Sequence, residues 1–228
     1  MEDESKLKYL LEEVAKIKIG KMVPSEKCFA KDGIPYITEE VLKKLLIEDD
    51  TSDLPKIDST FKEQFSFSRV PAQSILLNKI NLKDTSIYQC KTDVCIGHDI
   101  IAIIPNESIV ISDYLFHFMK WYQINKERRN VYRLMIDLPT ISIQLKVVQL
   151  LNAVQRLLTN KDSLVTAVKE LPQHFDHISR QAKQHSKSLH HGFEQLQYLY
   201  IAMLDNIFNG DFLNVVQEYH SFQRLSNE

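Results

Sequence analysis

The C-terminal part of this chain carries an apolar heptad repeat, and that repeat limits the fold more than any other feature of the sequence. Apolar residues spaced alternately three and four apart keep one seam of a helix against a partner helix. Pro172 interrupts the pattern, because proline removes a backbone donor and disfavours helix at the preceding residue. The first run consists of Val147, Leu150, Val154, Leu157, Lys161, Leu164, Val168 and Leu171. The second consists of Phe175, Ile178, Ala182, His185, Leu189, Gly192, Leu196, Leu199 and Met203.

The first run predicts a helix about 45 Å long at ~1.5 Å per residue. Such a helix with one apolar seam is not stable alone, so its seam pairs either with the second run folding back or with another chain. We expect a helical, coiled-coil-forming segment at residues 141–213 and a C-terminal tail at 214–228. The residues expected to serve oligomerisation are Val147, Leu150, Val154, Leu157, Leu164, Leu196, Leu199 and Met203.

The front of the chain, residues 1–140, mixes short strands and helices, which predicts an α+β domain. Thr38 followed by two glutamates begins a helix, and Pro35 suits an edge strand or a loop. Pro105-Asn106 ends the last strand, and Ser112 begins an aromatic-rich helix. The expected elements are a helix or strand at Leu7–Ile17, a strand-like segment at Lys31–Thr38, a helix to about Ile47, strands within Phe65–Leu77, at Ile87–Cys90 and at Cys95–Ile104, and a helix from Ser112.

The composition is that of an ordinary globular protein: 228 residues, 44% hydrophobic and 25% charged. The three cysteines form no disulfide framework, the N-terminus is charged, and no run approaches the ~20 apolar residues of a membrane span. These features favour a reducing, cytoplasmic setting without a membrane.

The formal net charge of −2 conceals two basic clusters. Lysines outnumber acids in residues 16–31, and lysines and arginines outnumber them in residues 120–133, while residues 39–58 are mainly acidic. Each cluster can be an ordinary solvated face. Two clusters at opposite ends of one domain, however, favour an anionic partner such as nucleic acid.

The sequence carries no recognisable catalytic motif. None of its five glycines falls in the spacing of a phosphate-binding loop, and the methyltransferase signature of Asn or Asp, two prolines and an aromatic residue is absent. Cys90, Cys95 and His98 have metal-ligand spacing, but no second pair follows, so buried strand cysteines are the favoured interpretation. We expect no metal and no cofactor.

Several segments resemble, in chain order, the specificity subunit of Type I restriction-modification systems. The opening Gly20-Lys21 followed by Gly33-Ile34-Pro35-Tyr36-Ile37 is similar to the family's GK or GGTP turn and GIPWI segment. The further matches are VPAQSILL at 70–77 with VPAGSILL, CIGHDIIAIIP at 95–105 with the family's CNQGFKAIIP strand, the helix at 112–121, IDLPTISIQ at 136–144 with IPLPPLEEQ, and MLDNIFNGDF at 203–212 with LLxxAFxGxL.

This resemblance implies an α+β target recognition domain followed by long coiled-coil-forming helices. It implies a non-catalytic subunit that reads double-stranded DNA and works with an adenine-specific methyltransferase subunit and an ATP-dependent restriction subunit. Family members usually carry two recognition domains, whereas this chain has one, which implies a homodimer or pairing with another half-subunit. The candidate DNA contacts are Lys18, Lys21, Lys31, Tyr36, Lys79, Lys83, Arg128, Arg129 and Arg133.

Three alternatives stay open from the sequence. The chain can be a coiled-coil adaptor that binds protein only, an enzyme with an unrecognised site, or a silent cassette that binds nothing. A salt-dependent affinity for DNA would separate the first from a DNA-reading subunit.

Overall fold

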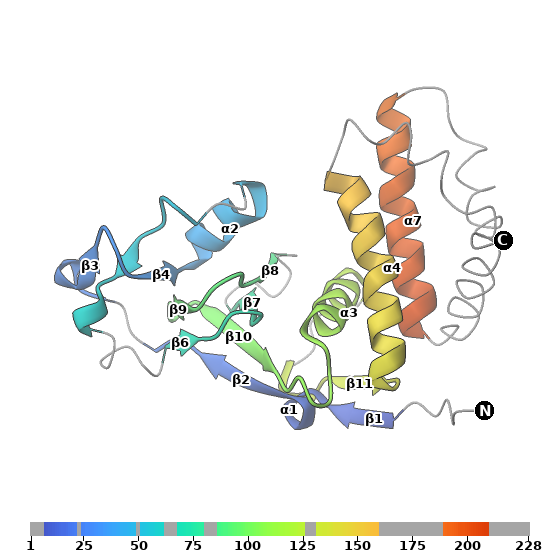
Figure 1. Ribbon diagram of the computed structural model, residues 1–228, viewed down its shortest axis with the longest axis horizontal. Coiled ribbons are helices and arrows are strands. Elements are labelled where there is room, and N and C mark those ends of the chain that lie inside the picture. Colours follow the sequence, from blue (N-terminus) through green and yellow to red (C-terminus); the bar gives the residue numbers. More distant parts are fainter. Residues whose placement is uncertain are drawn as a thin grey trace. The chain divides into compact units, whose positions relative to one another are not determined.

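The computed structural model describes residues 7–21, 24–48, 51–61, 68–79, 86–125, 131–159 and 189–209. The chain divides into two compact units, Met1–Leu138 and Pro139–Glu228. In Figure 1 the first unit contains short strands and helices, and the second contains long helices. The α+β expectation for the front half is therefore confirmed.

A four-stranded antiparallel sheet forms the centre of the first unit. Its strand order is β2-β10-β7-β8, so β10 pairs with both β2 and β7. All four side chains of β7 are buried, as are the first four of β10, because both faces of the sheet are covered. The bounds are β2 Ala15–Ile19, β7 Ile75–Asn78, β8 Ile87–Gln89 and β10 Ile100–Pro105.

A second sheet has the order β3-β5-β4-β9-β6. Its strands are β3 Phe29–Ala30, β4 Ile34–Ile37, β5 Lys56–Ile57, β6 Arg69–Val70 and β9 Val94–Ile96. The expectation of an edge strand at Pro35 is wrong, since β4 lies between β5 and β9. Pro35 is tolerated there because it is paired only with Lys56 of β5, while β9 pairs in parallel with Tyr36 and Ile37.

The single strand expected at Cys95–Ile104 is two strands that belong to different sheets. β9 ends at Ile96 and β10 begins at Ile100, with Gly97–Asp99 forming a turn between them. The sequence pattern did not reveal this break because the residues on both sides of it are apolar and buried. The turn joins the five-stranded sheet to the four-stranded sheet.

Helices cover the sheets and complete the core. Val41, Leu42 and Leu45 of α2 (Glu39–Glu48) belong to the same buried cluster as residues of β7 and β10. The expected helices at Thr38 and Ser112 are confirmed by α2 and by α3 (Ser112–Asn125). The segment expected as one helix or strand at Leu7–Ile17 instead contains β1 (Leu7–Leu10), α1 (Leu11–Val14) and β2. β1 pairs antiparallel with β11 (Met135–Leu138), and the short 3-10 helices are η1 Glu26–Cys28, η2 Ser59–Phe61 and η3 Val131–Arg133.

The second unit contains α4 (Ile141–Thr159) and α7 (Leu189–Asn209), which lie side by side (Figure 1). The contact between α4 and α7 agrees with the folding-back alternative, and pairing between chains stays a prediction. Gln144 at the start of α4 is fully buried, and its Nε2 donates to the carbonyl of Pro139 at 2.9 Å.

Two of the predicted seam residues, Val147 and Met203, are each 1% exposed. Leu150 is only partly buried, whereas the neighbouring Leu151 is fully buried, so the buried stripe of α4 is wider than a strict heptad seam. Leu164 and the side chains of Val154, Leu157, Leu196 and Leu199 lie outside the described residues. In the part of the chain that the structure describes, no helix has both the length and the apolarity needed to cross a membrane.

Candidate nucleic-acid interface

The turn Gly97–Asp99 is the point where three of the sequence-predicted contact residues come together. Lys21 follows β2 and Lys79 follows β7, and both strands run antiparallel to β10. The Gly20 N–H donates to the carbonyl of Ile100 at 3.3 Å, and the Lys79 N–H donates to the carbonyl of Asp99 at 2.7 Å. The exposed Lys21 and Lys79 therefore flank the turn that leads into the central strand.

Tyr36, the third of these residues, reaches the turn through β4. The Gly97 N–H donates to the carbonyl of Ile37 at 2.8 Å, one residue beyond Tyr36. The Tyr36 side chain is only 5% exposed and stacks edge-on against Phe29, with ring centroids 5.7 Å apart. Burial, with the nearby charge of Asp99, raises the pKa of Tyr36 to about 12. Tyr36 is therefore a neutral, largely buried phenol that supports the turn.

Asp99 anchors the turn to helix α2. Its carboxylate oxygen Oδ2 accepts the Glu39 N–H at 2.7 Å and so satisfies one of the free donors at the start of the helix. Thr38, the expected cap, accepts the Val41 N–H at a longer 3.4 Å. Sequence reasoning missed Asp99. A single carboxylate inside the apolar run of residues 94–103 was the only signal for it.

Two glycines allow the backbones to meet at this turn. A Cβ placed on Gly20 would lie 2.0 Å from the carbonyl oxygen of Gly97. A Cβ on Gly97 would lie 2.5 Å from Asp99 Oδ1 and 3.1 Å from the Tyr36 hydroxyl. Because both spaces are already filled, a larger residue at Gly20 would push the turn away from β2, and one at Gly97 would displace the Asp99 carboxylate.

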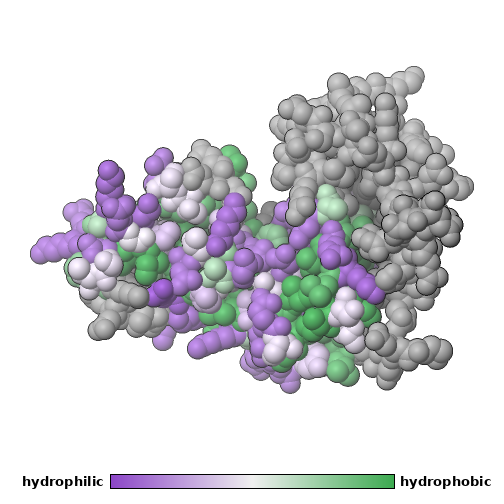
Figure 2. Space-filling view, viewed as in Figure 1, coloured by the Kyte–Doolittle hydropathy of each residue, from purple (hydrophilic) through white to green (hydrophobic). Residues whose placement is uncertain are grey.

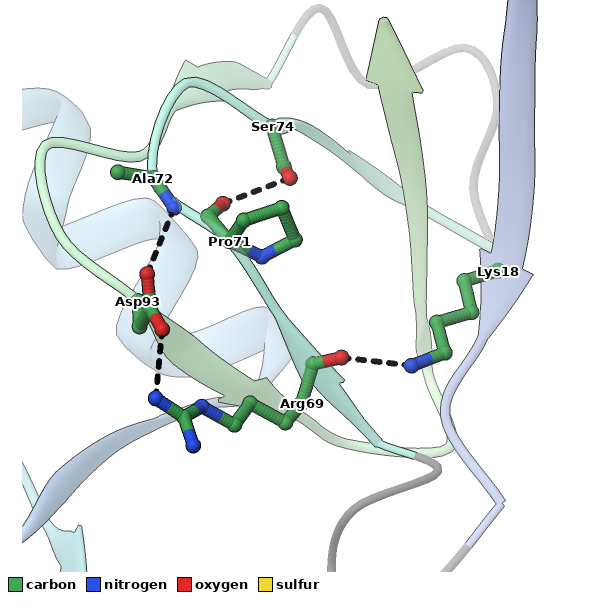
Figure 3. A network of polar contacts seen from close by, with 6 residues as sticks. All are labelled: Lys18, Arg69, Pro71, Ala72, Ser74 and Asp93. Atoms are coloured by element: carbon green, nitrogen blue, oxygen red, sulfur yellow. Dashed lines mark hydrogen bonds and ion pairs between the residues drawn. The ribbon is translucent and has the colours of Figure 1, made fainter.

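Lys18 is bound within the protein. Its Nζ donates to the carbonyl of Arg69 at 2.6 Å and thereby ties β2 to β6 (Figure 3). Burial, followed by repulsion from Lys16, lowers the pKa of Lys18. The sequence predicted a contact to DNA at this lysine, and that role stays a prediction beside the structural one.

Arg69 and Asp93 continue the same network, and sequence reasoning named neither of them. The Arg69 Nη2 contacts Asp93 Oδ2 at 2.7 Å, and the other oxygen of Asp93 accepts the Ala72 N–H at 3.1 Å (Figure 3). Ser74 Oγ donates to the carbonyl of Pro71 at 2.7 Å. These bonds hold the Pro71–Ser74 turn, in which Gln73 has a φ of +65°. Both members of the ion pair are about a third or more exposed, so its contribution to stability is small.

The other candidate contacts are spread over the unit. Lys31 is exposed between β3 and β4, at an end of the unit where Figure 2 shows hydrophilic residues gathered on the face in view. Arg133 is exposed in η3, beside Leu134, whose carbonyl accepts the Leu11 N–H at 2.8 Å. Leu11 precedes β2, whereas Lys21 follows it, beside the Gly97–Asp99 turn. Arg133 is therefore at the opposite end of β2 from this turn. Lys83, Arg128 and Arg129 lie outside the described residues.

The described residues contain no group of three or more His, Cys, Asp or Glu side chains arranged to hold a metal ion. Cys28, Cys90 and Cys95 are buried free thiols. Burial was expected for Cys90 and Cys95; Cys95 lies in β9 as predicted, whereas Cys90 directly follows β8. Burial raises the pKa of Cys90 to about 12 and that of Cys95 to about 11. Cys90 and Cys95 are therefore protonated near neutral pH and are poor nucleophiles.

No protein-family model matches this chain, and no curated protein matches its sequence. Solved structures do match. The HsdS subunit from Thermoanaerobacter tengcongensis shares 16% identity and a TM-score of 0.53, with 91% of this chain and 46% of that chain covered. A structure described as the basis of complex assembly and conformational transition of the type I R-M system shares 19% identity and a TM-score of 0.51, with the same two coverages. This chain therefore spans about half the length of the proteins it matches. The resemblance found in the motifs is confirmed at the level of the fold, and this chain has the fold of about half of an S subunit of a Type I restriction-modification system.

Proposed function

We propose that this chain is a half-length specificity subunit that reads one half-site in double-stranded DNA. In this role it performs no chemistry and positions an adenine-specific methyltransferase subunit and an ATP-dependent restriction subunit on the DNA. The observation that carries the proposal is the fold match, which covers 91% of this chain and 46% of the S subunit. The free thiols fit the reducing cytoplasm in which such a complex would act.

Exposed lysines and arginines would supply the affinity for DNA. Ammonium and guanidinium groups on surface loops contact phosphates, which orients a protein on the duplex without reading its sequence. Each phosphate contact adds about 0.9 to the slope of log affinity against log salt. The double change Arg128→Ala/Arg129→Ala is expected to weaken binding to every duplex and to flatten this slope by up to about 1.8.

A matched control is Lys43→Ala/Lys44→Ala, which removes two cations from α2, within the acidic stretch of the sequence. The control should leave the slope unchanged. An unchanged slope in the arginine variant would place the DNA surface elsewhere.

A homodimer of this chain would recognise a gapped palindromic site. One recognition domain per chain supplies one half-site specificity, and the two-fold symmetry of the protein would be mirrored in the DNA. The helices would set the gap. Deleting four residues from the helix expected before Pro172 would shorten it by about 6 Å, and the preferred gap should contract by about two base pairs at ~3.4 Å each, with the half-site sequence unchanged.

Methylation mapping by sequencing tests the homodimer, with the methyltransferase subunit supplied. A gapped palindrome supports it. A contiguous or asymmetric site would instead indicate a second, different half-subunit as the partner.

The second candidate function is a coiled-coil adaptor without DNA binding, which the apolar helices α4 and α7 favour. Both functions predict assembly through the helical segment, so Leu150→Asp/Leu157→Asp should dissolve the oligomer in either case. A measurable, salt-dependent affinity for duplex DNA excludes the adaptor, and its absence in the presence of the methyltransferase subunit excludes the DNA-reading subunit.

A further inference from the structure

The tip of the Gly97–Asp99 turn carries one exposed side chain, that of His98. All other residues from Val94 to Ile103 are buried. The resembling family strand has no histidine in its motif, so the proposed function has not used this residue.

Hydrogen bonds hold the backbone of the residues before and after His98. The Gly97 N–H donates to Ile37, the Ile100 N–H donates to the Gly97 carbonyl at 3.1 Å, and the Asp99 carbonyl accepts the Lys79 N–H. The Asp99 carboxylate, below the tip, accepts the Glu39 N–H. Because these bonds connect the turn to β4, β7 and α2, His98 projects from a fixed base rather than from a loose loop.

Cations stand on both sides of this tip. In the strand registers Ile19 is opposite Ile101, and Asn78 is opposite Ile100. Continuing both registers places Lys21 and Lys79 on either side of Asp99, and both lysines are exposed. A DNA phosphate backbone bound by the Lys21 and Lys79 ammonium groups would run beside the His98 imidazole.

We infer that His98 reads a base edge in the DNA half-site, while Lys21 and Lys79 hold the flanking phosphates. This inference rests on the proposed function and adds a specificity-determining residue to it. Base reading requires donors and acceptors held in a fixed position, because an edge contact distinguishes bases only when its geometry is constant. His98 meets that requirement through its anchored turn. An imidazole can donate and accept hydrogen bonds, whereas a lysine ammonium acts as a point charge.

The experiment uses the full chain in its complex with the methyltransferase subunit. Bound sequences are selected from a library of randomised duplexes, and the affinity for DNA is measured as a function of salt concentration. His98→Ala should reduce the preference at one base pair of each half-site by about fivefold or more and leave the salt slope unchanged. Lys21→Ala/Lys79→Ala should lower the slope by about 1.8 and leave the selected sequence unchanged. Thr92→Ala, an exposed polar residue in the turn before β9, is the matched control and should change neither quantity.

Unchanged sequence preference in His98→Ala overturns the inference. A slope reduced by about 0.9 with the preference intact also overturns it, because His98 would then contact a phosphate. These outcomes leave the proposed function standing, since the wild-type complex still selects a half-site. If the wild-type complex selects no sequence, the proposed function fails, and this inference fails with it. Equal melting temperatures of the variants and the wild type confirm that the fold is retained.

Discussion

Replacing Asp99 with alanine should destabilise the chain by about 1–2 kcal/mol. The substitution removes a charge-assisted bond of 2.7 Å to the Glu39 N–H, and bonds to charged groups contribute about 1.5–3 kcal/mol. The loss of a carboxylate from the start of α2 adds about 0.3–1 kcal/mol. Against this, Asp99 Oδ1 is buried without a hydrogen-bond partner among the described residues, so removing it returns part of its desolvation cost, about 1–3 kcal/mol. Loss of the hydrogen bond destabilises the variant, whereas removal of the unpaired oxygen stabilises it. The net loss of folding free energy is therefore limited.

Urea and thermal denaturation of the full chain measure this loss. For a chain of this size, each kcal/mol lowers the melting temperature by roughly 2–4 °C, so Asp99→Ala should melt about 2–8 °C below the wild type. Asp99→Asn keeps an acceptor for the Glu39 N–H and should lose about half as much stability. Asp53→Ala removes an exposed carboxylate before β5 and should stay within about 0.5 kcal/mol of the wild type. An Asp99→Ala variant as stable as Asp53→Ala would refute the role assigned to the carboxylate.

Three further predictions test other parts of the structure. Leu151→Ala, at a fully buried position of α4, should cost about 2–5 kcal/mol in urea unfolding, whereas Leu145→Ala, at a position 48% exposed, should cost under about 1 kcal/mol; equal losses would contradict the burial of α4. The buried thiols of Cys28, Cys90 and Cys95 should resist iodoacetamide at pH 8 and react only after denaturation, as mass spectrometry would show, and rapid alkylation of the native chain would be inconsistent with their burial. Burial raises the folded-state pKa of Cys90 from 9.0 to about 12, so its contribution to stability is fully present below about pH 9 and is lost as the pH rises toward 12. The urea midpoint should therefore fall over that window, and it should fall less in Cys90→Ala than in the wild type; an equal fall in both would contradict the raised pKa.

Local sequence patterns predicted the elements that depend on nearby residues. The start of α2 after Thr38, the start of α3 at Ser112 and the end of β10 at Pro105 agree with the expected positions. Caps and prolines act within one turn of the chain, so they can be recognised without knowing the fold. The apolar stripe of α4 was recognised for the same reason, although Leu151 is fully buried there and Leu150 is only partly buried.

The candidate interface was only partly predictable. Lys21 and Lys79 were predicted as DNA contacts; both are exposed, and the contact with DNA stays a prediction. Lys18 belongs to the same basic run, but its ammonium is bound to the carbonyl of Arg69, 51 residues away in the chain. Residue type and charge runs do not show which cation meets a carbonyl from a distant strand.

Periodicity, capping and charge are local properties of a chain, so the amino acids alone indicated the α+β character of the N-terminal part, the helices of the C-terminal part and the basic clusters. The break of Cys95–Ile104 at Gly97–Asp99 depends on contacts between distant segments and is visible only in the folded chain. The same holds for the residues that meet at this turn, Gly20, Tyr36, Glu39 and Lys79. Their meeting depends on antiparallel pairing of β10 with both β2 and β7, which brings together residues nearly 80 positions apart in the chain. This register depends on the packing of the four-stranded and five-stranded sheets with α2 in one core. No single segment of the sequence contains the information that selects the register.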